Sequence, residues 1–307
     1  MLRVKSDFMK IHASKSDLKK WIKCVPTEGD LFFFDDACLK KIKKNSVTIL
    51  SPAKAKDPAM QIWDLNSRSW YGYSLNNSKA CAWMPPGMMA TLEKSLLNEI
   101  IKCQIRMGVP SFIKTTLLPK SVQKLLPQFG KYSWANAEDW AKLSTPQKAT
   151  VLHGWFVQNE IVSYKSYNFR SLPIEAKNEI RRLNIKHLLN SFESSSGPNC
   201  MGLVAGAISS KEDRVSLIKT WLHEKPFLNT LRQEKFSPIK DLHPQARDVL
   251  VFKAQNKVVH AAYCIDAEFY IEKPGQDFYE PYRISKFKKW NTEWPETTLT
   301  IWRRAKI

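Results

Sequence analysis

The chain has 307 residues, of which 43% are hydrophobic and 25% charged, and its formal net charge is +19. This composition is ordinary for a globular protein and excludes a collagen-like or low-complexity chain. No run approaches the roughly eighteen apolar residues of a membrane-spanning helix, and the first seven residues lack the apolar core of a secretory signal. We therefore expect a cytoplasmic protein without a membrane span, with export by a dedicated route left open.

The positive charge comes mostly from lysine and admits two interpretations. It suits contact with a polyanion, such as nucleic acid, anionic lipid or an anionic wall polymer. It is equally consistent with a solvated basic surface in a protein from a lysine-rich genome. The sequence contains no zinc finger, RRM signature, KH loop or Walker motif, so it indicates no nucleic-acid-binding module.

The six cysteines show no CxxC pair and no zinc spacing with the six histidines; they are Cys24, Cys38, Cys81, Cys103, Cys200 and Cys264. Reduced thiols are the simplest expectation for a cytoplasmic protein. We therefore expect a fold that requires neither a metal nor a disulfide. No motif indicates a cofactor.

Residues 1–87 are predicted to form a β-rich region of unknown role. Apolar runs bounded by turn residues predict strands at 29–34 and 46–50. Two aromatic segments, 61–65 and 69–73, indicate a hairpin. Basic residues lie between its rings, a pattern that suits stacking on bases or sugars, although aromatic residues in strands more often fill a core.

Residues 88–190 are predicted to be helical, because the pattern changes after Pro85-Pro86-Gly87. Apolar residues recur at helical spacing in three long segments, and two shorter helices lie between them. The predicted helices span 91–106, 119–127, 136–143, 146–162 and 173–192. They would form a middle domain or pack on the C-terminal one.

A buried helix is predicted to begin at Cys200, because a polar run ends at Asn199 and small or aliphatic residues follow to Ile208. In the first turn, unpaired backbone N–H groups and the positive helix end favour a thiolate. The same N–H groups can hold an oxyanion. The alternative is an inert side chain in a core helix, since free cysteines are buried more often than they react.

Three strands are predicted downstream, at 248–252, 258–265 and 268–272, as an antiparallel meander. His260 lies early in the middle strand and Glu272 late in the next, so a tight hairpin would place them side by side. Glu272 would then bind one imidazole nitrogen while the other faces Cys200. Between Cys200 and the meander, 211–234 is expected to be helical in two pieces broken at Pro226, and 299–303 is a predicted final strand.

The order of these segments resembles the NlpC-type papain-like cysteine peptidases over residues 191–307. Cys-x-Gly-Leu-Val begins at Cys200, Asp-x-Leu-Val-Phe begins at Asp248, and a polar residue follows the histidine on the next strand. In that family an Asp-Cys-Ser-Gly segment carries the nucleophile and a Gly-Asp-Leu-Val-Phe-Phe strand precedes the strand of the base. Here Asn199 replaces the Asp, Met201 the Ser and Arg247 the Gly of the strand motif.

The resemblance implies that Cys200 is the nucleophile, His260 the base and Glu272 the residue that orients it. It also implies an α+β chain whose C-terminal papain-like domain packs a nucleophile helix on an antiparallel sheet. The family's usual substrates are peptidoglycan stem peptides, and the departures beside Cys200 leave the substrate of this chain open. Five further residues are candidate substrate contacts: Asn199, Met201, Tyr279, Tyr282 and Arg283.

The function expected from these features is hydrolysis of an amide or peptide bond through an acyl-enzyme on Cys200. Two alternatives remain. The same triad would also support deamidation of a glutamine or acyl transfer to an amine or hydroxyl. A papain-like scaffold without activity would instead serve as a basic binding module. Thiol reactivity of Cys200 separates the catalytic readings from the last one.

Overall fold

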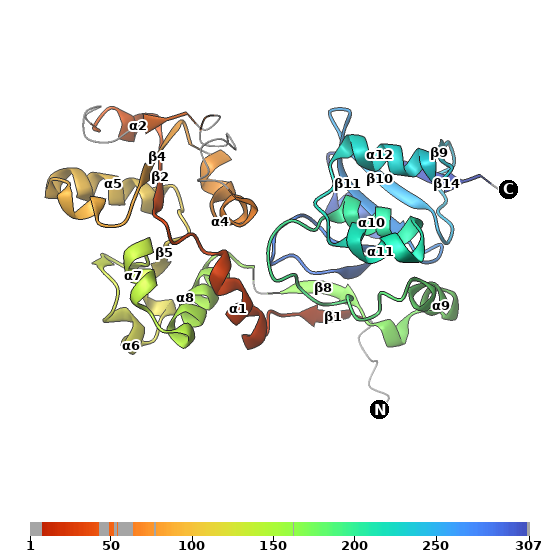
Figure 1. The fold of residues 1–307 in the computed structure, drawn as a ribbon, viewed down its shortest axis with the longest axis horizontal. Helices are drawn as coiled ribbons and strands as arrows, with labels where there is room; N and C mark the ends of the chain where they lie inside the picture. The colour runs from red at the N-terminus through yellow and green to blue at the C-terminus, as the bar shows by residue number, and fades with distance from the viewer. Residues whose placement is uncertain are drawn as a thin grey trace. The chain divides into compact units, whose positions relative to one another are not determined.

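The computed structural model describes residues 8–42, 49–51, 54, 64–76, 78–161 and 163–305. The chain divides into two compact units, which we call the N-terminal unit (Ala13–Val162) and the C-terminal unit (Met1–His12 with Ser163–Ile307) (Figure 1). The chain is mixed α+β, and its sheets are antiparallel. The predicted boundaries do not coincide with this division, since 87/88 lies within the N-terminal unit and 190/191 within the C-terminal unit.

The N-terminal unit contains two three-stranded sheets, with strand orders β2-β4-β3 and β5-β7-β6. Its elements are α1 (Lys15–Trp21), β2 (Asp30–Phe34), α2 (Asp36–Leu39), β3 (Ile49–Leu50), α4 (Leu65–Asn76), β4 (Ala80–Met84), α5 (Lys94–Arg106), β5 (Phe112–Lys114), α6 (Lys120–Gln123), β6 (Gln128–Phe129), β7 (Tyr132–Trp134), α7 (Ala137–Lys142) and α8 (Thr145–Gln158). The region predicted to be all-helical therefore includes a sheet of its own.

The predicted aromatic hairpin is wrong, because residues 69–73 belong to helix α4; residues 61–63 lie outside the described residues. Trp70 and Tyr71 are buried, and their rings pack on Trp155 at 4.6 Å and on Phe33 at 5.5 Å between centroids. Packing of these rings into the core outweighs their preference for strands. They are thus not available for stacking on bases or sugars.

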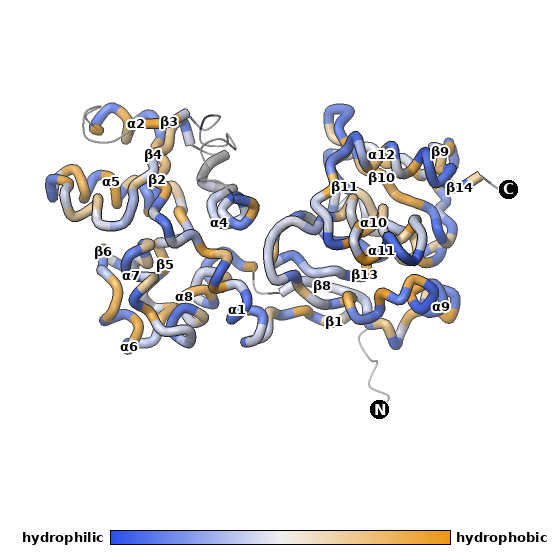
Figure 2. Tube along the Cα trace, viewed as in Figure 1, coloured by the Kyte–Doolittle hydropathy of each residue, from blue (hydrophilic) through white to orange (hydrophobic). Residues whose placement is uncertain are grey.

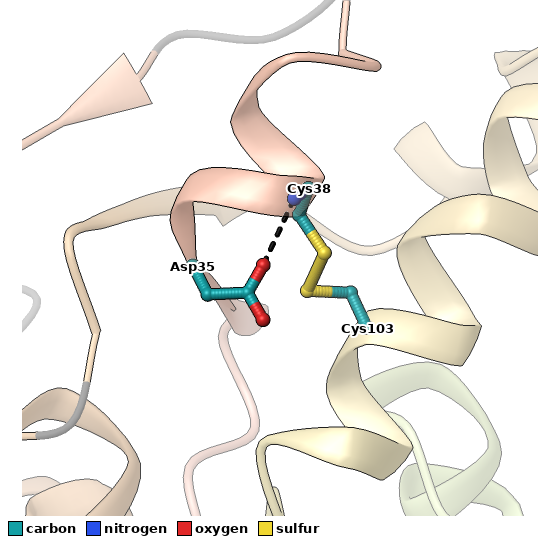
Figure 3. A group of neighbouring side chains, drawn as sticks. All are labelled: Asp35, Cys38 and Cys103. Atoms are coloured by element: carbon teal, nitrogen blue, oxygen red, sulfur yellow. Dashed lines mark hydrogen bonds between the residues drawn. A yellow bond between two sulfur atoms is a disulfide. The ribbon is translucent and has the colours of Figure 1, made fainter.

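The expectation of six reduced cysteines is wrong for one pair, because Cys38 on α2 and Cys103 on α5 form a disulfide (Figure 3). Asp35 caps α2 by accepting a hydrogen bond from the Cys38 backbone N–H at 2.9 Å, and its carboxylate also binds Arg106. The carboxylate and the two sulfur atoms lie close together, as metal ligands would, but both sulfur atoms are committed to the disulfide. A separation of 65 residues leaves no local spacing from which this pair could be predicted.

The C-terminal unit is built on a six-stranded antiparallel sheet of order β13-β12-β11-β10-β14-β9, and β1 pairs with β8 beside it. Its elements are β1 (Phe8–Ile11), β8 (Tyr164–Tyr167), α9 (Ile174–Leu183), α10 (Cys200–Ile208), α11 (Lys211–Ile218), α12 (Glu224–Gln233), β9 (Phe236–Ile239), β10 (Val249–Ala254), β11 (Lys257–Cys264), β12 (Phe269–Glu272), β13 (Arg283–Lys286), α13 (Trp290–Glu293) and β14 (Thr298–Arg304). The predicted meander and final strand are thus found as β10–β12 and β14.

Helix α10 is buried along its whole length. Figure 2 shows hydrophobic residues both in this helix and along β10. Gly202 and Gly206 let α11 approach closely: a Cβ atom at Gly202 would lie 2.4 Å from the carbonyl oxygen of Thr220, and one at Gly206 would lie 2.5 Å from the Ile218 side chain. Helices α10 and α11 thus form a hairpin that packs against the sheet, and Cys200 is the first residue of α10.

The two faces of the sheet carry different cores, because successive strand residues point to opposite faces. Val251, Ala261 and Ile271 belong to the core that includes α10. Phe252, Ala262 and Tyr270 belong to the core on the other face. By the same alternation, the side chains of His260 and Glu272 lie on the face of this second core.

Several predicted helices differ in extent from the observed ones, and two of the differences have a clear cause. The segment 173–192 is helical only to Leu183, because Asn184 adopts a left-handed conformation with φ of 56° and ends α9. The break in 211–234 falls between α11 and α12 rather than at Pro226, which lies in the first turn of α12, where a missing N–H costs no helical hydrogen bond. Among the described residues, no helix combines the length and apolar character needed to cross a membrane.

Candidate active site

Cys200 is the first residue of α10, and only 4% of its surface is exposed. Asn199 caps the helix through its Oδ1 atom, which accepts a hydrogen bond from the Gly202 backbone N–H at 2.9 Å. The thiol therefore lies at the positive end of a helix, beside N–H groups of the first turn. Such N–H groups can bind an oxyanion next to the thiol.

His260 is held on β11 opposite Phe252 of β10, directly after a bulge in the pairing of these strands. Glu272 lies on the neighbouring strand β12. The observed register, Tyr263 opposite Ile271, continues to place Glu272 opposite Ala262, which makes it a diagonal neighbour of His260 on the same face. His260 Nε2 and Glu272 Oε2 are 2.7 Å apart, and both side chains are fully buried.

The other carboxylate oxygen of Glu272 is held from β13. Arg283 Nε donates to Oε1 at 2.8 Å, and Ser285 Oγ donates to the same atom at 2.6 Å. Burial alone would raise the pKa of Glu272, but the Arg283 charge and the hydrogen bonds from His260 and Ser285 lower it to about 2. The carboxylate is therefore ionised when it binds the imidazole.

The imidazole of His260 is favoured in its protonated form. Burial would lower its pKa, but the electrostatic interaction with Cys200, followed by that with Glu272, raises it to about 9. With Nε2 bound to Glu272, Nδ1 is the ring nitrogen left to interact with Cys200. Among the described residues Nδ1 makes no hydrogen bond, and a catalytic hydrogen bond often forms only when substrate binds.

Trp294, which directly follows α13, stacks on the imidazole with 4.0 Å between ring centroids and 12° between planes. The indole covers one face of His260 and limits access of water to its bond with Glu272. Sequence reasoning missed this residue, since nothing in its spacing relates it to His260. It also missed Ser285, which the alternation of β13 after Arg283 would have indicated.

Four of the five predicted substrate contacts are buried or make contacts within the fold. Asn199 caps α10 and also donates from Nδ2 to the Leu222 carbonyl at 2.8 Å. Met201 is buried in the core around α10. Tyr282 is 1% exposed, and Arg283 binds Glu272. The contacts of these side chains are thus made within the C-terminal unit.

Tyr279 is the remaining candidate, and it is half-buried. Its hydroxyl donates to the Asp277 carboxylate at 2.8 Å, within the loop that follows β12. Tyr279 therefore stays a candidate substrate contact, because part of its side chain is exposed.

Together, the site consists of a thiol at the start of a helix and an imidazole hydrogen-bonded to a buried carboxylate, residue types that acyl-transfer chemistry uses. Comparison of the chain with protein-family models, with curated proteins and with solved structures finds no match.

Proposed function

We propose that the C-terminal unit is a papain-like, NlpC-type cysteine hydrolase that cleaves an amide or peptide bond. The observation that carries this proposal is the buried hydrogen bond between His260 Nε2 and Glu272 Oε2, which leaves Nδ1 for Cys200. A core histidine needs no ionised carboxylate partner, whereas a base that must form an imidazolium does. The raised pKa of His260 supports the same assignment, because it favours an imidazolium beside a thiolate.

In the acylation step, Cys200 Sγ attacks the carbonyl carbon of the amide and forms a C–S bond. The oxyanion is held by backbone N–H groups of the first turn of α10. His260 then donates its proton to the leaving nitrogen as the C–N bond breaks, which releases an amine and leaves a thioester. Glu272 keeps the ring in place and stabilises its charged form.

In the second step, His260 removes a proton from water, whose oxygen attacks the thioester carbonyl. The C–S bond breaks, the carboxylic acid leaves, and Cys200 with His260 returns to its starting state. Glutamine deamidation follows the same course with ammonia as the leaving group, and acyl transfer replaces water by an amine or hydroxyl. The triad is common to all three.

The proposal is tested by incubating the full chain with a mixture of unlabelled peptides and measuring new primary amines and ammonia. Cys200→Ala serves as the matched control, because it removes one sulfur atom. New amines that depend on Cys200 support hydrolysis, whereas ammonia alone indicates deamidation. Repeating the assay with added methylamine detects acyl transfer as a mass increase on the peptides. If none of these products depends on Cys200, the proposed chemistry is wrong.

A further inference from the structure

Lys273 is a fully buried lysine that the proposed mechanism does not use. It directly follows Glu272 at the end of β12. Since strand residues alternate between faces, Lys273 continues the α10 side of the sheet on which Ile271 lies, while Glu272 faces His260. Its Nζ atom donates to the backbone carbonyls of Gly275 at 2.7 Å and Asp277 at 2.9 Å. The buried ammonium thus organises the loop that follows the strand.

This loop, residues 274–282, is bound to the segment 190–199 that leads into Cys200. Backbone hydrogen bonds join Gly197 N to Gln276 O at 2.9 Å and Tyr282 N to Ser191 O at 3.1 Å. The Phe278 N–H also donates to Ser196 Oγ at 3.2 Å. Gly197 has a φ of 138°, a conformation that favours glycine, so the path into the nucleophile is specific. Hydrogen bonds therefore connect Lys273, through the loop, to the segment that precedes α10.

Four ionisable groups interact electrostatically with Lys273: Glu280, Asp277, Glu193 and Cys200. Burial lowers the pKa of Lys273, and these groups act in the opposite direction. Glu280 accepts a hydrogen bond from Asp277 N, and burial followed by the Asp277 charge raises its pKa to about 7.

Glu193 is already engaged elsewhere, because it accepts hydrogen bonds from the Tyr282 hydroxyl and Lys219. Lys273 and His260 thus lie on opposite faces of the sheet, and each has an electrostatic interaction with Cys200.

We propose that Lys273 is a positioning residue for Cys200: it holds the 274–282 loop against the 190–199 segment, and its buried charge favours the thiolate. The inference rests on the proposed function, because a nucleophilic Cys200 is what gives the thiolate a role. Its experiment measures thiol reactivity rather than turnover, so the two can fail separately.

The experiment follows alkylation of Cys200 by iodoacetamide in the full chain between pH 5 and 9, with the modified peptide identified by mass spectrometry. Lys273→Gln removes the charge, and Lys273→Arg keeps it. Lys257→Gln, an exposed lysine at the start of β11, is the control. We expect Lys273→Gln to lower the rate at pH 6 about tenfold and to shift the profile to higher pH. Lys273→Arg and the control should retain the profile of the unmodified chain.

A profile for folded Lys273→Gln that superimposes on that of the unmodified chain would overturn the inference, whether or not amide hydrolysis is observed. If Lys273→Gln does not fold, Ser196→Ala tests the positioning half, since it removes a hydrogen bond between loop and segment and leaves the charge in place. It should lower the alkylation rate at every pH without moving the midpoint. An unchanged rate in Ser196→Ala would then overturn the proposal.

Discussion

Glu272 binds His260 through one carboxylate oxygen at 2.7 Å and is itself held through the other by Arg283 and Ser285. Three adjacent strands, β11 to β13, thus contribute one chain of hydrogen bonds that fixes the imidazole. Because His260, Glu272 and Ser285 are buried, the imidazole keeps one orientation, in which Nδ1 is not bound to Glu272. The relationship accounts for an imidazole that is favoured in its protonated form and held in one orientation.

Replacing Glu272 by Gln should lower kcat/KM about ten- to a thousandfold, because an amide still accepts a hydrogen bond but no longer stabilises the imidazolium. The structure adds an effect on stability: Arg283 loses a fully buried counter-ion, so the melting temperature should fall by several degrees. Glu293→Gln is the matched control, since this carboxylate also binds Arg283 but is 30% exposed. Full activity in Glu272→Gln would exclude its orienting role.

The stability of the protein should depend on pH through His260. Folding raises the pKa of His260 from 6.5 to about 9, so this contribution is complete below pH 6.5 and is lost as the pH rises through 9. The pKa of Glu272 is lowered from 4.5 to about 2, so its contribution is complete above pH 4.5 and is lost as the pH falls through 2.

Urea unfolding of the unmodified chain at pH 6.5 and pH 9 measures this loss. The difference should shrink in His260→Gln and persist in His243→Gln, whose ring is 94% exposed. Equal differences in all three proteins would show that His260 does not titrate as described.

Trp294→Ala should lower kcat several-fold, because water would then reach the bond between His260 and Glu272. Trp290→Ala is the appropriate comparison: its ring packs on Phe252 at 6.2 Å in the same core. Both substitutions remove an indole, so a loss of activity specific to Trp294 reports its contact with His260. Equal activity losses in the two variants would assign Trp294 to packing alone.

Reduction of the Cys38–Cys103 disulfide should lower the melting temperature of the N-terminal unit, since the bond closes a long loop and is worth about 2–4 kcal/mol. The Cys38→Ser, Cys103→Ser double variant should melt at the same temperature with and without reductant. Thermal melts of both proteins check this. A melt of the unmodified chain that does not respond to reductant would contradict a stabilising disulfide.

Local patterns were sufficient to predict the elements that carry the site. The apolar run after Asn199 predicts α10, and the alternation around His260 predicts the strands, because both are set by burial over a few residues. The hydrogen bond between His260 and Glu272 follows from strand adjacency. The fold of residues 61–76 and the Cys38–Cys103 pair could not be predicted in this way, because distant packing partners decide them.

Roles within the site were harder to predict than positions. Arg283 was expected to contact substrate, yet it lies opposite Glu272 on β13 and binds it. Tyr282 and Met201 are core residues although they neighbour the site in sequence. The face on which a side chain lies decides its role, and that face depends on strand register, which sequence spacing alone does not determine.

Iodoacetamide labelling at pH 6.5 tests whether Cys200 is a nucleophile activated by His260. Cys24, Cys81 and Cys264 are also buried thiols outside the disulfide, so they serve as internal references. Cys200 should be modified at least about a hundredfold faster than these thiols, and His260→Ala should remove most of this difference. Modification of Cys200 at the rate of the other three, or a rate unaffected by His260→Ala, would contradict this role of Cys200.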